Sequence, residues 1–213
     1  EIRTYLAEGT GSVHGRLSVT PAGFRGMLFT PQGVVYIDPY AMGDAEHYVV
    51  YRAGDLRVDP ALRGRIDEEV IGDESQRAAA PRGDARAHGT TLRTYRLAVA
   101  ATGEYTQFHG GTVAGGLAAV VTTMNRVTGI YERDVAVSFQ LVANNNLLIY
   151  TNAATDPYTN TSGDLNANQT NINLVIGSAN YDVGHLVGTG GGGVAQLGVI
   201  CGSSKARGLT GSS

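Results

Sequence analysis

Between residues 95 and 142, short apolar runs that are typical of strands stand on both sides of a stretch with the apolar spacing of a helix. This alternation restricts the chain to folds in which helices pack on a sheet. Residues 95–101 form a short apolar run that is typical of a buried strand. Residues 112–132 place apolar side chains at three- and four-residue steps, which predicts one face of a long helix. Residues 135–142 and 147–150 return to strand-like runs, separated by a turn of consecutive asparagines.

The rest of the chain continues this alternation. Residues 164–178 predict a second helix, residues 183–187 a further strand, and residues 194–201 a last strand that follows a run of glycines. Strands that alternate with helices in this way indicate a mixed, mostly parallel sheet with helices packed on it. We therefore predict an α/β (α+β) fold with two helices for residues 93–213.

Residues 1–52 show a different pattern, in which short runs alternate apolar and polar positions between turn residues. Thr30-Pro31-Gln32-Gly33 has its proline where a type I or II turn favours it, so this region predicts a small β-meander. Residues 53–92 carry charges of both signs and almost no periodic apolar signal, which indicates a solvated linker that a protease can cut. The predicted parts are a β-rich region (1–52), a charged linker (53–92) and an α/β region (93–213).

Charge, hydrophobicity and cysteine content exclude several classes of protein. The formal net charge is -3, which leaves no basic excess to bind a phosphate backbone, so we expect no nucleic-acid partner. No apolar run approaches the roughly 18 residues that span a bilayer. Many glycines and tyrosines with a single lysine are more typical of an exported than a cytosolic protein, and we expect any export signal upstream of Glu1.

The motifs in the chain give no complete active site. Residues 188–193 satisfy Gly-x-Gly-x-x-Gly, but they lead into a strand and no acidic residue follows, so a flexible glycine loop is favoured over a nucleotide site. The histidines form no His-Glu-x-x-His motif, and Gly-x-Ser-x-Gly is absent from the sequence. His47 beside Glu46 is interpreted as a surface pair, and His185 near Asp182 as a polar residue at a strand end.

Other candidate residues also have simple interpretations. Asp156, Asp164 and Asp182 lack the spacing of an EF-hand loop, and we interpret them as solvated loop acids. Arg82-Gly83-Asp84 is a three-residue match that a charged linker contains by chance. Cys201, the single cysteine, ends an apparent apolar strand and is predicted not to be a nucleophile.

Several longer strings, read in order, resemble a known family. They are residues 95–101, Thr122-Thr123-Met124-Asn125-Arg126-Val127-Thr128-Gly129-Ile130-Tyr131-Glu132-Arg133-Asp134, Val137-Ser138-Phe139-Gln140-Leu141, Asn180-Tyr181-Asp182-Val183-Gly184-His185-Leu186 and Gly193-Val194-Ala195-Gln196-Leu197-Gly198-Val199-Ile200-Cys201. They resemble the upper half of the catalytic domain of reprolysin-like zinc metallopeptidases, a branch of the metzincins, in its bacterial form. Residues 205–213 resemble the stretch before the active-site helix, and residues 1–52 resemble the end of the family's propeptide.

This resemblance implies a secreted zinc metalloendopeptidase, made as a zymogen, that acts on peptide or protein substrates. In the family, three histidines of His-Glu-x-x-His-x-x-Gly-x-x-His hold Zn²⁺ and the glutamate is the general base. That motif is absent from the sequence and is expected downstream of Ser213. The resemblance therefore implies a chain truncated before its zinc site, with no catalytic or metal-ligating residue of its own and no activity alone.

The resemblance also assigns residues outside the zinc motif. The family's last strand before the active-site helix pairs antiparallel with the substrate backbone, and the matching positions are Val194, Ala195, Gln196, Leu197 and Gly198. Cys201 matches a cysteine that forms a disulfide with a downstream cysteine. The family's calcium site uses an acid in the first strand, where this chain has Arg96, although Asp182 matches another ligand; calcium is therefore possible but disfavoured. Contact between the propeptide region and the catalytic part is also expected.

Two other functions remain open from the sequence. The first is a non-catalytic binding module, in which the β-rich region binds a partner and the α/β part is a scaffold. The second is an inhibitory propeptide, in which residues 1–52 cover the substrate cleft of the protease itself.

Overall fold

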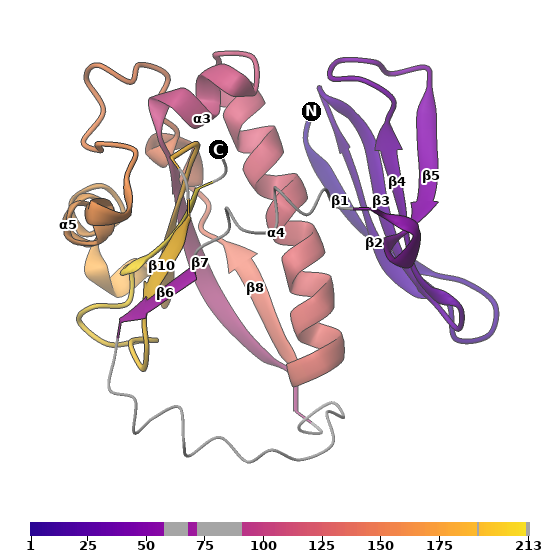
Figure 1. Ribbon diagram of the computed structural model, residues 1–213. Coiled ribbons are helices and arrows are strands. Elements are labelled where there is room, and N and C mark those ends of the chain that lie inside the picture. Colours follow the sequence, from indigo (N-terminus) through magenta and orange to yellow (C-terminus); the bar gives the residue numbers. More distant parts are fainter. Residues whose placement is uncertain (58–67, 72–90, 191, 212–213) are drawn as a thin grey trace.

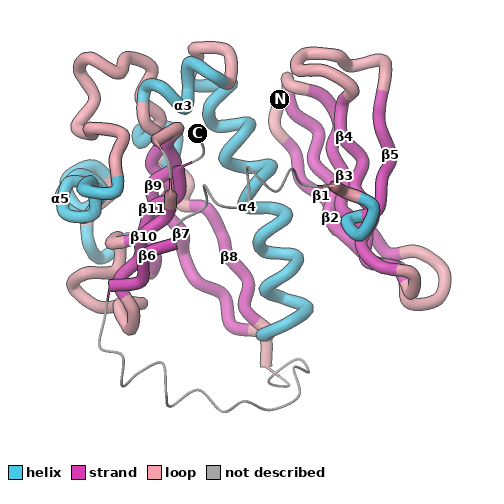
Figure 2. The backbone as a smooth tube through the Cα atoms, in the orientation of Figure 1, coloured by secondary structure: helices cyan, strands magenta, loops and turns pink. Residues whose placement is uncertain are grey.

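The computed structural model describes residues 1–57, 68–71, 91–190 and 192–211, which form four stacked layers (Figure 1). An N-terminal sheet packs on helix α4 (Val113–Val135), α4 packs on a central sheet, and α5 (Leu165–Val175) covers the opposite face of the central sheet (Figure 2). This combination of an antiparallel sheet, a mixed sheet and few helices confirms the predicted α+β class. No helix among the described residues is long and apolar enough to cross a membrane.

The N-terminal sheet is an antiparallel meander, as predicted. Its strands pair in chain order and are β1 (Arg3–Glu8), β2 (His14–Thr20), β3 (Gly23–Thr30), β4 (Gly33–Pro39) and β5 (Tyr48–Arg52), followed by the short 3-10 helix η1 (Ala53–Asp55). The β2–β3 and β3–β4 turns share one chemistry: a threonine hydroxyl accepts a hydrogen bond from the amide two residues on and donates to the carbonyl of a glycine. Gly23 and Gly33 adopt φ values of 102° and 114°, which side-chain-bearing residues avoid.

The central sheet has the strand order β6-β10-β11-β9-β7-β8. Its strands are β6 (Glu68–Ile71), β7 (Arg93–Ala101), β8 (Val137–Leu141), β9 (Val183–Gly188), β10 (Gly193–Gln196) and β11 (Gly208–Gly211). Every neighbouring pair is parallel except β10 with β11, which confirms the mostly parallel sheet. The predicted strand over 194–201 is too long, because the chain turns after Gln196, and strand β11 was not predicted.

The helices follow the predicted periods with two differences. The helices expected over 112–132 and 164–178 are confirmed by α4 and α5, and Thr112 caps α4 by accepting a hydrogen bond from the Gly115 amide. A further short helix, α3 (Gly103–Phe108), was not predicted because six residues show no period. The expected strand over 147–150 is wrong: residues 145–148 form the 3-10 helix η2 (Asn145–Leu148).

Helix η2 forms at a point where the side chain of Asn145, and not a further strand, makes the hydrogen bonds to the backbone of β7. Asn145 is buried, and its amide Oδ1 accepts from the Val99 N–H at 2.8 Å while its Nδ2 donates to the Val99 carbonyl at 2.9 Å. One asparagine thus satisfies both backbone groups of Val99 beyond the end of β8. This two-point bond leaves the triple asparagine unable to act as a hairpin turn.

The two faces of β7 carry two hydrophobic clusters. Leu97, Val99 and Ala101 face α4, and Ala98 and Ala100 face α5. The α5 side is the larger cluster, to which β9, β10 and β11 also contribute; its members are Ala98, Ala100, Leu148, Tyr158, Leu165, Ile172, Ile176, Tyr181, Leu186, Val194, Ala206 and Leu209. The core therefore holds β10 and β11 in the sheet through Val194 and Leu209.

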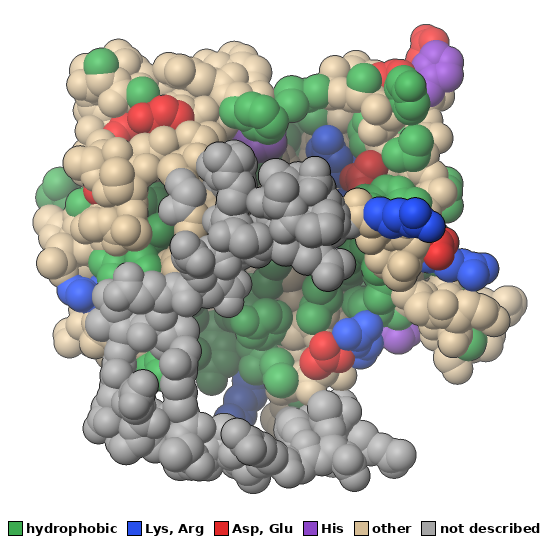
Figure 3. Space-filling model, in the orientation of Figure 1, with side chains coloured by type: hydrophobic (Ala, Val, Ile, Leu, Met, Phe, Trp, Pro, Cys, Tyr) green, Lys and Arg blue, Asp and Glu red, His purple; other side chains and the backbone are tan. Residues whose placement is uncertain are grey.

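The N-terminal sheet contacts α4 through both apolar and polar groups. Met27 and Phe29 are 0% and 5% exposed against the helix, and Figure 3 shows hydrophobic side chains where the two meet. Arg126 donates to Asp38 Oδ1 at 2.7 Å, and Asn125 Nδ2 donates to the Leu17 carbonyl at 2.9 Å. The β-rich region is thus attached to the outer face of α4.

Most of the predicted linker (53–92) lies outside the described residues. Within it, η1 and β6 are described, and β6 is a strand where the sequence showed no periodic signal. Its pairing with β10 is made by main-chain groups, which need no apolar period.

Candidate functional site

The candidate site is strand β10, which lies next to one edge of the central sheet. On one side β10 pairs antiparallel with β11, with Val194 opposite Leu209 and Ala195 opposite Gly208. On its other side it pairs in parallel with β6 over residues 68–71 (Figure 1). Without β6, strand β10 would be the free edge of the sheet formed by residues 93–211.

The five predicted substrate-binding residues divide between this strand and the turn after it. Val194 is 3% exposed and belongs to the core, whereas the side chain of Ala195 is exposed and that of Gln196 is partly exposed. Leu197 and Gly198 lie in the turn, and Gly198 adopts φ 70°. Only the first three of these residues are therefore placed to pair with an extended backbone.

Asn160, for which the sequence predicted no role, holds the glycine loop that precedes β10 in the chain. The Asn160 Oδ1 accepts from the Thr189 and Gly190 amides at 2.9 and 3.1 Å, and its Nδ2 donates to the Thr189 hydroxyl at 2.8 Å. A Cβ on Gly190 would lie 1.8 Å from the Asn160 carbonyl oxygen, so the loop needs glycine there. Only the run of glycines signalled a tight backbone approach; its partner, Asn160, lies in a distant polar loop.

His185 lies beside this region on β9, inside the strand and not at its end as predicted. Its Nε2 is 3.0 Å from the hydroxyl of Thr210, and its Nδ1 lies against Gly208, where a Cβ would be 3.1 Å away. Desolvation lowers the pKa of His185 to about 4. The imidazole is therefore neutral at pH 7, and it is a structural group of the sheet.

The other predicted acids and histidines bind protein groups. Asp156 Oδ2 accepts from the Gly103 amide at 2.6 Å, and buried Asp164 accepts from the Thr159 amide at 3.0 Å, so Asp164 is not the solvated acid that we expected. His47 pairs with Asp44, not with Glu46, at 3.1 Å. Exposed Cys201 lies in a turn, which corrects its predicted place in a strand.

Asp182 forms an ion pair with Arg96, at 2.7 Å between Asp182 Oδ1 and Arg96 Nη2. Among the residues that the structure describes, no three His, Cys, Asp or Glu side chains are grouped to hold a metal. The residues that the structure describes therefore do not fit a zinc site.

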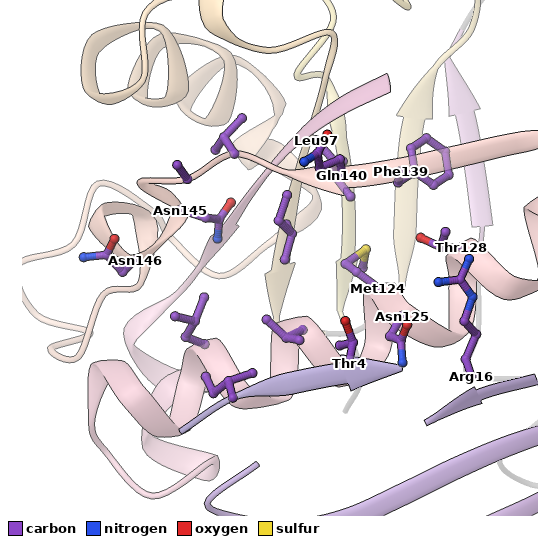
Figure 4. A pocket seen from close by; sticks show the side chains of 16 residues that line it. Thr4, Arg16, Leu97, Met124, Asn125, Thr128, Phe139, Gln140, Asn145 and Asn146 are labelled. Carbon is purple, nitrogen blue, oxygen red and sulfur yellow. The ribbon is translucent and has the colours of Figure 1, made fainter. Parts of the chain in front are cut away.

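A separate cavity lies at the opposite edge of the central sheet, between β8, α4 and the N-terminal sheet (Figure 4). Its volume is about 430 Å³, and Leu97, Met124 and Phe139 give it an apolar wall. Among the described residues that line the cavity, Arg16 is the only ionisable one, and it pairs with Glu132. The part of its lining that the structure describes therefore contains no acid–base pair for catalysis.

Comparison with known proteins gives the family. Residues 91–213 match the model of the reprolysin-like metallopeptidases, metallo-peptidase family M12B. The chain belongs to this family. The match begins just before β7, so it includes β10 and the whole central sheet except β6. No curated protein matches the chain.

Membership confirms the resemblance of residues 95–201 to the reprolysin-like metallopeptidases. For a reprolysin-like metallopeptidase the expected activity is proteolysis, and the expected substrates are peptides or proteins. The N-terminal sheet and β6 lie outside the matched residues, so their roles follow from their contacts alone.

Proposed function

We propose that this chain is the N-terminal part of a secreted, zinc-dependent metalloendopeptidase of the bacterial branch, and that β10 binds the substrate backbone. The observation that carries the proposal is the outer side of β10, which accepts an extended strand by main-chain pairing. Addition of a peptide strand to a sheet edge gives affinity through the backbone and requires no special side chain.

The chain's own contribution to this function is a rigid edge. Val194 fixes β10 to the core, and Asn160 fixes the loop before it. Zinc, when bound in such enzymes, polarises the substrate carbonyl and lowers the pKa of a water molecule. In the family the metal is held by His-Glu-x-x-His-x-x-Gly-x-x-His, which this sequence does not contain, so we assign the metal to a segment beyond Ser213.

The pairing of β6 favours a second function for residues 1–92, as an inhibitory propeptide. In the family, substrate is expected to run antiparallel to the strand that β10 matches, whereas β6 runs parallel to it. A segment with reversed direction would occupy the edge without presenting its peptide bonds in the cleavable orientation. Residues 1–52 lie on α4, so we assign any such inhibition to residues 68–71 and not to the N-terminal sheet.

Peptide binding to two forms of the full chain separates these proposals. Residues 68–71 would be replaced by four prolines, which have no N–H group to donate to β10, and the control would carry four prolines at residues 80–83. A fluorescein-labelled Val-Thr-Val-Thr-Val peptide flanked by lysines should bind the first form more tightly than the control, as measured by anisotropy. Equal binding by both forms would contradict the inhibitory role, and no binding by either form would contradict the substrate edge.

The zinc-dependent activity needs its own test. The codons after Ser213 should encode His-Glu-x-x-His-x-x-Gly-x-x-His, and the extended protein should hydrolyse casein until a zinc chelator is added. A stop codon or an unrelated sequence there would rule out the peptidase and leave the binding or inhibitory role.

A further inference from the structure

Arg96 is half exposed and donates hydrogen bonds to oxygen atoms of Ala179 and Asp182, which lie in the segment between α5 and β9. Its Nε and Nη2 donate to Asp182 Oδ2 and Oδ1 at 3.0 and 2.7 Å, and its backbone N–H also donates to Oδ2 at 2.8 Å. Its Nη1 donates to the carbonyl of Ala179, in the 3-10 helix η4 (Ser178–Asn180), at 2.9 Å. The guanidinium therefore joins β7 to the segment between α5 and β9.

A second cation completes this cluster. Lys205 is 8% exposed; its Nζ donates to the Ser178 carbonyl at 2.5 Å and lies 4.5 Å from the centre of the Tyr181 ring. Adjacent carbonyls of η4 are thus bound by two positive charges from different parts of the chain. The Cys201 amide donates to the Asp182 carbonyl at 3.0 Å, which ties the C-terminal turn to the same cluster.

A calcium ion does not fit among these groups. Calcium takes six to eight oxygen ligands, usually from several carboxylates. Both oxygens of Asp182 accept hydrogen bonds from Arg96, and the described residues bring no group of three acids, histidines or cysteines together. A guanidinium, by contrast, presents a planar set of N–H donors that matches one carboxylate and a carbonyl.

We infer that Arg96 serves as a built-in cation in place of a divalent metal, and that it holds η4 and the turn around Cys201 against β7 without calcium. Hydrogen bonds from Arg96 hold the pKa of Asp182 below its usual value, so the carboxylate stays ionised at neutral pH. This inference is independent of the peptidase proposal, because it concerns how the scaffold is held together.

Thermal unfolding of the full chain tests the inference. The melting temperature should be the same in millimolar calcium chloride and in EDTA. Arg96→Glu places two carboxylates beside the η4 carbonyls, so its melting temperature in EDTA should fall by about 2–4 °C or more, and calcium should raise it again. Arg93→Glu makes an equal charge change at an exposed position of the same strand. Its melting temperature should be the same in calcium chloride and in EDTA.

Two results would overturn the inference. One is a wild-type chain that calcium stabilises and EDTA destabilises. The other is an Arg96→Glu variant whose melting temperature matches that of Arg93→Glu in both solutions. If Arg96→Glu does not fold, the neutral Arg96→Gln variant replaces it, and a melting temperature equal to that of the wild type would again contradict the role of the cation.

Discussion

His185 makes the stability of the fold depend on pH in a defined direction. Its folded pKa of about 4 is below the unfolded value of 6.5, so the folded state favours the neutral ring. The stabilisation is complete above pH 6.5 and is lost as the pH falls toward 4, by at most about 1.4 kcal/mol per pH unit. Urea unfolding of His185→Gln at pH 7.5, 5.5 and 4.5 should show a smaller loss than the wild type. A His185→Gln slope equal to that of the wild type would contradict this assignment.

Asn145 offers a second test at a single residue. Asn145→Ala leaves the N–H and carbonyl of buried Val99 without partners, which should cost about 1–3 kcal/mol for each group. Asn146→Ala is the matched control, because the neighbouring asparagine is exposed. Urea unfolding measures both variants, and similar losses from the two would show that the Val99 bonds contribute little.

At the scale of single residues, some roles could be predicted from the sequence and others could not. The single cysteine and the histidine spacing led us to predict no complete catalytic site in this sequence, and that stays a prediction. The sequence could not show that Asn145 binds Val99 or that Asn160 binds Thr189, because partners far apart in the chain leave no local pattern.

At the scale of elements, Gly129 lets α4 and the N-terminal sheet approach closely. A Cβ at this position would lie 2.8 Å from Arg16 Cγ and 3.0 Å from Met27 Cε. Gly129→Leu should therefore force the sheet away and cost about 1–3 kcal/mol through overpacking. Hydrogen exchange should show lost protection in β2 and β3, whereas Thr123→Leu, on an exposed position of α4, should leave their protection unchanged. Unchanged protection in Gly129→Leu would mean that the interface repacks at little cost.

Elements with a sustained period were predictable, and the short ones were not. The periods over residues 95–101 and 112–132 correspond to β7 and α4, because each element buries one or both faces over many residues. Strand β11 has four residues and only one large apolar side chain, Leu209. Its place between β9 and β10 is set by pairing in three dimensions, and the same holds for β6 beside β10.

At the scale of the whole molecule, the sequence indicated the family and a β-rich region before it, but not where that region attaches. Residues 1–52 carry apolar side chains on alternate positions, which predicts a sheet and leaves its partner surface open. The structure places that sheet on α4, on the far side of the helix from the central sheet. The division into regions 1–52, 53–92 and 93–213 stays a proposal.

These contacts predict that cutting the linker does not separate the chain. With a protease site placed within residues 72–90, the two fragments should elute together in gel filtration, because Met27 is fully buried against α4 and Arg126 binds Asp38 across the same interface. Arg126→Ala should release part of the N-terminal fragment, and Arg52→Ala, at an exposed position of β5, should not. Separation of the wild-type fragments would contradict the prediction. Because β6 would stay on the bound N-terminal fragment, we expect β10 to pair with added peptide only after that fragment dissociates.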